Sequence, residues 1–399
     1  VEGAVMRSGE RVRITARLIH PATDRQLWSE SYERDLRDVL ALQGEVARAV
    51  ASQIRAQVRL GSTRPVDPQA YELFLRGQYL LNRIGKEDTL AAIPLLEKAV
   101  AQDPSFAAAH NALARAWRDR SWFHAPEETR ELEPKALAAV EKALSLDPEL
   151  AEAYVTRALL IWTPSNQWPA ERAVPDLRRA LDLNPNSDYA LGYLASLHSH
   201  NGLLEEAFQE GQQAALLNPA SSQPQLSMAA SLLHRGNADA ALAVYRNIPR
   251  QTLPSSLGGH TAWSLFQLGR KQEAFSTIEE FQRDFPDDSA GGLAAMKAVL
   301  LADAGDLRAA EGNIHSTEKK KAFADFHHTS YLLACAYALL NRPQPALDWL
   351  EYTARTGFPN YPLFERDRLL DSLRQDARFQ RFLAAEKKHW ERRKVTLAR

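Results

Sequence analysis

Pairs of helix-like segments recur along most of this chain, and their regular spacing constrains the fold more than any other feature. The pairs run from about residue 67 to residue 355, and a small residue marks the second segment of each later pair at steps of 34, 33, 36 and 36 residues. These residues are Ala207, Ala241, Ala274, Ala310 and Ala346. A hairpin of two short helices cannot bury its apolar side alone, so neighbouring hairpins must cover one another. The spacing therefore predicts a solenoid of stacked helical hairpins.

Other residue types recur with the same period. The first segment of each pair carries a small residue where two antiparallel helices come closest, because a larger side chain would push them apart. These residues are Gly77, Ala114, Ala158, Ala195, Ala229, Ala262, Ala298 and Ala334. A glycine then ends the first helix in several pairs, because glycine adopts a left-handed backbone at low steric cost. These glycines are Gly202, Gly236, Gly269 and Gly305.

The unit from Tyr189 to Pro219 combines all of these features, and its closing proline prevents the second helix from continuing. A period near 34 residues with this pattern resembles the tetratricopeptide-repeat family. The resemblance implies a mainly α fold, an α–α superhelix of about eight hairpin repeats in which the first helix of each repeat lines a concave surface. Insertions at residues 82–89 and 121–131 distort the first two repeats.

Residues 1–62 follow a different pattern. Apolar and polar residues alternate between residues 12 and 18, which predicts a half-buried strand. Segments 1–7 and 26–32 complete a predicted three-stranded meander. Apolar residues at steps of three or four between residues 36 and 58 predict one amphipathic helix. Three strands and a helix are marginal alone, so we infer that this segment is one half of a small α/β domain whose amino-terminal half is missing.

Residues 1–62 resemble the carboxyl half of a TolB-like amino-terminal domain. The resemblance rests on Val12-Arg13-Ile14-Thr15-Ala16-Arg17-Leu18 and Leu27-Trp28-Ser29-Glu30-Ser31-Tyr32. In bacteria such domains precede tetratricopeptide repeats in CadC-type winged-helix regulators, serine/threonine kinases and nucleotide cyclases. The resemblance implies a signalling parent, with any catalytic domain upstream of this chain. The predicted division is a TolB-like segment at 1–62, a linker at 63–69, the solenoid at 70–355, and capping helices with a basic tail at 356–399.

Composition and motifs argue against several classes of function. Forty-nine Lys and Arg against 50 Asp and Glu leave a net charge of −1, so we expect no nucleic acid to bind through this region. No apolar run reaches the roughly 20 residues that a membrane-spanning helix needs. The sequence lacks the common phosphate-binding, dinucleotide-binding and hydrolase motifs, so we predict no catalysis and no cofactor. The single cysteine, Cys335, is predicted to be a small buried apolar residue.

Eleven histidines raise the question of metal binding. The candidates are His198, His200, His234, His260, His327 and His328. Repeat position places His198 between helices, and places the side chains of His200, His234, His260 and His328 on the concave surface. No histidine pair four residues apart is accompanied by a carboxylate, so we predict no metal site, with a histidine metal cluster as the alternative. Groove histidines that titrate near neutrality would make binding depend on pH.

The repeat resemblance also assigns other residues to the concave surface. Aromatic and histidine side chains there suit an apolar, extended or helical peptide, and the alternative is that several of them pack as core. These residues are Trp162, Tyr189, Tyr193, His200, His234, His260, Trp263, Phe266 and Tyr331. Nearer the amino terminus, Asn111, Arg115 and Arg118 share one helix face and would suit an acidic group.

These patterns predict a non-catalytic scaffold that binds a protein or peptide in a concave groove. Its predicted context is the sensing or interaction region of a bacterial signalling or transcription-regulatory protein. The alternative is a free-standing assembly or periplasmic adaptor protein without an output domain. The sequence leaves open whether the segment lies in the cytoplasm or the periplasm, whether a membrane span outside this chain tethers it, and whether it forms homo-oligomers.

Overall fold

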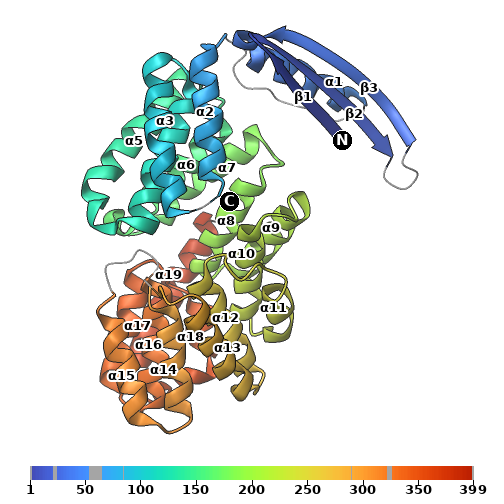
Figure 1. Ribbon diagram of the computed structural model, residues 1–399. Helices are drawn as coiled ribbons and strands as arrows, with labels where there is room; N and C mark the ends of the chain where they lie inside the picture. The colour runs from blue at the N-terminus through green and yellow to red at the C-terminus, as the bar shows by residue number, and fades with distance from the viewer. Residues whose placement is uncertain are drawn as a thin grey trace. The chain divides into compact units, whose positions relative to one another are not determined.

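The chain divides into two compact units in the computed structural model (Figure 1). Unit 1 contains Val1–Leu160 and Asp182–Asn184, and unit 2 contains Ile161–Leu181 and Pro185–Arg399. The structure describes residues 2–20, 25–53, 65–83, 85–288, 290–320 and 326–397. The end of the predicted first helix, residues 54–58, and the predicted linker residues 63 and 64 lie outside this description.

Unit 1 begins with a three-stranded antiparallel sheet. Its strands are β1 (Glu2–Ser8), β2 (Arg11–His20) and β3 (Arg25–Asp35), paired in chain order. This arrangement confirms the predicted meander. Val12 and Ala16 are buried while Arg13 and Arg17 are exposed, as the alternation predicts. The edge strand β1 is exposed along the part for which side chains are described, including Val5.

Helix α1 (Val39–Gln53) follows the 3-10 turn η1 (Leu36–Asp38) and packs against strands β2 and β3 (Figure 1). Leu42 of α1 belongs to the same buried cluster as Tyr71 and Phe74 of helix α2 (Pro68–Leu81). The Gln43 side-chain amide donates a hydrogen bond of 2.6 Å to the Tyr71 hydroxyl oxygen. The small α/β segment therefore shares a core with the first helical hairpin.

The remaining helices of unit 1 continue the hairpin pattern. Helix α2 packs against α3 (Lys86–Gln102), and α4 (Ala107–Asp119) packs against α5 (Thr129–Leu146). The predicted insertion at 121–131 overlaps a π-helical turn, η2 (Arg120–His124), and a 3-10 turn, η3 (Pro126–Glu128). Helix α6 (Ala151–Ile161) follows.

Unit 2 is a stack of helical hairpins. From α8 to α14, each even-numbered helix packs against the odd-numbered helix that follows it and against the next even-numbered helix, and α16 packs against α17 (Figure 1). The helices are α7 (Ala170–Leu183), α8 (Asp188–His200), α9 (Leu204–Leu217), α10 (Ser222–His234), α11 (Ala238–Tyr245), α12 (Pro254–Gln267), α13 (Lys271–Asp284), α14 (Gly292–Asp303), α15 (Leu307–Glu318), α16 (Phe326–Leu339) and α17 (Pro343–Arg355). The predicted stacking of helix pairs is confirmed, and the count of about eight repeats stays a prediction.

The turns between paired helices confirm the predicted role of glycine. Gly202, Gly236, Gly269 and Gly305 all adopt a left-handed backbone, with φ between 75° and 82°. At the first of these turns the Leu203 N–H donates to the His198 carbonyl oxygen at 2.9 Å, which closes the end of α8. Asn341, with φ of 55°, takes the same place between α16 and α17.

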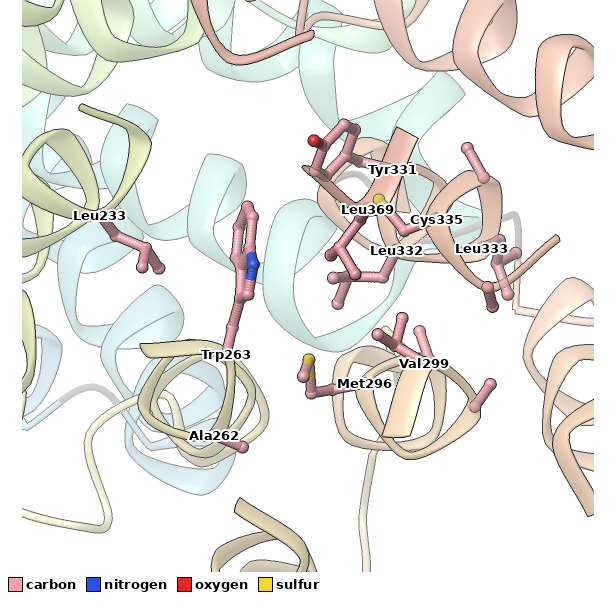
Figure 2. Packing of buried hydrophobic residues seen from close by; sticks show 14 of the residues in the cluster. Leu233, Ala262, Trp263, Met296, Val299, Tyr331, Leu332, Leu333, Cys335 and Leu369 are labelled. Carbon is pink, nitrogen blue, oxygen red and sulfur yellow. The ribbon is translucent and has the colours of Figure 1, made fainter. Parts of the chain in front are cut away.

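The small residues predicted at helix contacts are buried, and large side chains fill the space around them. Figure 2 shows Ala262 and Trp263 on α12 close to Met296 on α14, and Tyr331 and Cys335 on α16. Cys335 is fully buried, which confirms the sequence prediction. Met296 is also fully buried, so it does not line an exposed surface.

The chain turns back across unit 2 after α17. It forms α18 (Tyr361–Arg366), the 3-10 helix η5 (Arg368–Leu373) and α19 (Ala377–Leu397). The Asn360 side-chain amide donates to the Ser199 carbonyl oxygen at 2.9 Å, and the Trp390 indole N–H donates to the Gly202 carbonyl oxygen at 2.9 Å. The last helices therefore contact the end of α8 as well as the last hairpin. None of the described helices combines the length and apolar character needed to cross a bilayer.

Gly258 and Gly312 give a matched test of the close helix contacts in unit 2. A Cβ atom at Gly258 in α12 would lie 2.6 Å from the Phe281 ring and 2.7 Å from the Leu293 side chain, whereas one at Gly312 in α15 would meet nothing within 4 Å. We expect Gly258→Ala to lower the free energy of unfolding by about 1–3 kcal/mol. Gly312→Ala should raise it by up to about 1 kcal/mol. Urea titrations followed by circular dichroism measure both, and equal effects would contradict the argument.

Candidate functional site

Histidine and aromatic rings from several helices meet inside unit 2. His200 and His234 end α8 and α10, His260 and Trp263 lie on α12, and the remaining members come from the start of α16 and from the segments before α7 and after α17. We call this group the ring cluster. Its members are Trp162, Trp168, His200, His234, His260, Trp263, His327, His328 and Phe358.

Phe358, which follows α17, contacts histidines from three helices. Its ring centroid lies 5.6 Å from that of His200, 5.3 Å from that of His234 and 4.8 Å from that of His328. Phe358 is almost fully buried in this position. The carboxyl-terminal segment therefore supplies the residue around which the first helices of three hairpins gather.

Two tryptophans close another side of the cluster. The Trp162 ring lies 4.9 Å from His200 and 5.1 Å from Trp168, and Trp168 lies 4.9 Å from His327. Trp168 has a left-handed backbone, with φ of 56°, which is uncommon for a bulky residue. A Cβ atom at Gly357 would lie 2.6 Å from the Trp168 ring, so glycine permits this contact. Backbone strain at Trp168 is thus concentrated beside the histidines.

Four histidines of the cluster, His200, His234, His260 and His328, are held in their neutral form. Desolvation, the largest cause, lowers the pKa of His200 and of His260 to about 4. Desolvation and the nearby histidines hold the pKa of His234 and of His328 well below the ordinary value. The hypothesis that these groove histidines titrate near neutrality is therefore wrong for the folded chain, because their burial disfavours the charged ring.

Four buried polar atoms around the cluster have no hydrogen-bond partner among the described residues. They are Trp162 Nε1, Trp263 Nε1, His234 Nε2 and the Tyr245 hydroxyl oxygen. Tyr245 adjoins the cluster, since its ring stacks on that of His260 at 5.8 Å. Leaving a buried polar group unpaired costs about 1–3 kcal/mol, so several in one place single out this cluster as a candidate site.

The predicted groove residues of unit 2 differ in exposure. Trp162, His234, Trp263 and Tyr331 are buried, whereas Tyr189, Tyr193, His200, His260 and Phe266 are partly exposed. The Tyr331 hydroxyl donates to the Asp367 carboxylate at 2.7 Å. Trp263 and Tyr331 belong to the hydrophobic core, which agrees with the alternative that some of these residues pack as core. The assignment of the set to a peptide groove stays a prediction.

His198 packs between helices as predicted, with its Nδ1 atom 2.8 Å from the Glu210 carboxylate.

The polar face predicted on α4 lies in unit 1. Arg118 is buried and donates to the Asp119 carboxylate at 2.9 Å, and the Arg115 Nε atom lies 3.6 Å from the same carboxylate. Asn111 is partly buried on the same helix. An acidic ligand at this face would have to compete with Asp119, and the site stays a prediction.

Sequence reasoning did not identify Trp168 or Phe358, and it did not bring His200 together with His327. The two histidines are 127 residues apart, and the rules applied to histidines concerned local spacing. Two sequence features could have pointed to these residues. They are the two tryptophans within seven residues, Trp162 and Trp168, and the Gly357-Phe358 pair after the last hairpin.

Comparison with known proteins identifies the repeats. The tetratricopeptide repeat family matches residues 81–121, 170–227 and 260–288. A protein of Rhizobium meliloti (strain 1021) named putative adenylate cyclase 3 is 31% identical over 170 residues. That match spans 40% of this chain and 28% of the relative's length. The chain therefore contains tetratricopeptide repeats and shares part of its sequence with a much longer relative.

Solved structures show the same fold at low sequence identity. The Rap protein complexed with Competence and Sporulation Factor has a TM-score of 0.56 and 14% identity, over 81% of this chain and 99% of the Rap chain. The human IFIT1 dimer with PPP-AAAA has a TM-score of 0.54 and 13% identity, over 78% of this chain and 77% of the IFIT1 chain. These likenesses show a tetratricopeptide-like helical fold.

Acid should destabilise the fold through the buried histidines. The lowered pKa of His234 means that the unfolded chain binds more protons than the folded chain below about pH 6.5, so stability is lost as the pH falls. We expect His234→Gln to reduce this loss, by up to about 1.4 kcal/mol per pH unit. His315→Gln is the control, because the His315 side chain is 82% exposed and lies outside the ring cluster. Denaturant titrations between pH 7 and pH 5 in EDTA measure the slopes, and an unchanged slope in His234→Gln would refute the prediction.

Proposed function

We propose that this chain is a non-catalytic module that binds an extended peptide segment of a protein partner on the first helices of its repeats. We further propose that it is the sensing or interaction region of a bacterial signalling or transcription-regulatory protein. One observation carries the first part: a segment of the chain itself already lies on this helix face in unit 2.

The covering segment, residues 357–366, uses the contacts that a bound peptide would use. The Arg366 guanidinium donates to the carbonyl oxygens of His234 and Arg235 at 2.5 and 2.7 Å, at the end of α10. Asn360 makes a similar contact with a carbonyl oxygen at the end of α8, and Phe358 inserts its ring among the histidines. An aromatic anchor together with hydrogen bonds to main-chain carbonyl oxygens is a combination that a bound peptide could also use.

The unpartnered indole groups support a ligand with hydrogen-bond acceptors. Trp162 Nε1 and Trp263 Nε1 are donors only, and peptide carbonyl oxygens are acceptors of suitable strength. Beyond the ring cluster, Tyr189 and Tyr193 on α8 form an edge-to-face pair at 4.9 Å and are partly exposed. This pair presents aromatic rings on the first helix α8 that are partly accessible to a partner.

Two comparisons support the wider context. The structure of the Rap protein contains Competence and Sporulation Factor, so a protein with this fold forms such a complex. The relative named putative adenylate cyclase 3 is longer than this chain's match to it, which supports a parent protein with an output domain. The alternative, a free-standing adaptor, has the same binding surface and lacks that domain.

Peptide selection tests the proposal directly. Random peptides of roughly twelve residues, displayed on phage, are selected on the whole chain, and the affinity of the winners is measured by fluorescence anisotropy. We expect Tyr193→Ala to weaken binding at least about tenfold, because aromatic anchors dominate such interfaces. Leu216→Ala is the matched control, since Leu216 is 77% exposed on the second helix α9. Failure to select any peptide, or equal binding by both variants, would reject an aromatic peptide surface on α8.

The covering segment provides a second test. Arg366→Ala removes two hydrogen bonds that hold this segment against the end of α10. If a peptide occupies the same face, it competes with the covering segment. Because Arg366→Ala holds this segment less firmly, selected peptides should bind the variant several-fold more tightly. Arg355→Ala, on α17, is the control. Unchanged affinity in Arg366→Ala would place the peptide elsewhere.

A further inference from the structure

Three histidine side chains from two distant parts of the sequence converge in unit 2. His200 is the last residue of α8, and His327 and His328 lie in the first turn of α16. Each offers a ring nitrogen, and the three nitrogens all lie within 4.8 Å of one another. The Nε2 atoms of His200 and His327 are 3.1 Å apart. Two ligands of a tetrahedral Zn²⁺ ion with bonds of about 2.0 Å are separated by about 3.3 Å, so this spacing fits shared coordination.

The hydrogen bond at the other ring nitrogen determines what His200 can do. Its Nδ1–H donates to the Ser196 carbonyl oxygen at 2.6 Å, so Nε2 carries the lone pair. Metal-binding histidines are oriented by this kind of bond to a backbone carbonyl. The His200 Nε2 lone pair faces His327 Nε2, and such a pair needs either a proton or a cation between the nitrogens. A proton shared between His200 and His327 would not explain why a ring nitrogen of His328 also lies close to them.

The protonation state of the rings suits metal ligation. Burial lowers the pKa of His200 and of His328, so the rings are neutral at physiological pH, and neutral imidazole is the form that binds metal. The rings of Trp162, Trp168 and Phe358 pack against these histidines, so apolar rings surround part of the group.

The donor set indicates which ion fits. Within the part of the chain that the structure describes, the group consists of the three histidines, without a thiolate or carboxylate. Three imidazoles suit Zn²⁺, Cu²⁺ or Ni²⁺, whereas Mg²⁺ and Ca²⁺ prefer oxygen ligands. Three protein ligands leave a fourth position for water or for a group on another molecule.

We infer that His200, His327 and His328 form a binding site for a divalent transition-metal ion of the Zn²⁺ class. The site departs from the sequence-based prediction of no metal, which considered only local spacing. It does not depend on the peptide-binding proposal. A bound ion would link α8 to α16 and would stabilise the ring cluster around Phe358.

Metal titration of the whole chain, after treatment with chelator, tests the inference. We expect calorimetry with ZnCl₂ to show one ion per chain, and CoCl₂ to give the intense visible absorption of a four-coordinate site. His328→Gln should weaken Zn²⁺ binding at least about tenfold and reduce the Co²⁺ absorption. His315→Gln is the control, because its side chain is 82% exposed and lies outside the cluster.

The wild-type Co²⁺ spectrum decides the question even if a variant does not fold. Absence of both Zn²⁺ heat and Co²⁺ absorption in the wild-type chain would overturn the inference. So would equal Zn²⁺ affinity of folded His328→Gln and the wild-type chain, since binding would then come from other histidines. Loss of Zn²⁺ binding in His315→Gln with retention in His328→Gln would likewise overturn it.

Discussion

Close packing of the two antiparallel helices within each hairpin is the interaction on which the rest of unit 2 depends. Ala195, Ala229, Ala262, Ala298 and Ala334 leave room for that contact, and each is almost completely buried. The hairpins then stack on their neighbours, so their first helices follow one another through unit 2. His200 of α8 and His327 of α16 come within 3.1 Å of each other, although three other first helices lie between them in the sequence.

The ring cluster combines several costly features in one place. It contains neutral histidines with lowered pKa, indole N–H groups that find no partner within the described part of the chain, and a tryptophan in a left-handed backbone conformation. Each of these features opposes folding by a small amount, and the hydrophobic core around Trp263 and Tyr331 offsets them. Local conflicts of this kind concentrate at functional sites in natural proteins, because selection for activity maintains them against stability.

Much of the fold could be predicted from sequence because its determinants are local. A glycine that ends a helix, such as Gly236, or a small residue at a helix contact, such as Ala262, acts within a few residues or one repeat. The candidate site was predicted only in part, because the contacts of its histidines depend on Phe358, which lies far away in the sequence. The sequence placed His200 and His234 on one face, but it did not predict that the Phe358 ring returns to contact both of them. No repeat pattern encodes that return.

The contacts of the carboxyl-terminal segment with α8 also affect how the chain acquires its structure. An ordinary repeat array can fold progressively during synthesis, because each new hairpin needs only its predecessor. Here the end of α8 receives Asn360 and Trp390 from residues made more than 150 positions later. Unit 2 therefore cannot complete its interior until the ribosome has released the last helix, and the nascent hairpins expose unpaired aromatic rings to chaperones until then.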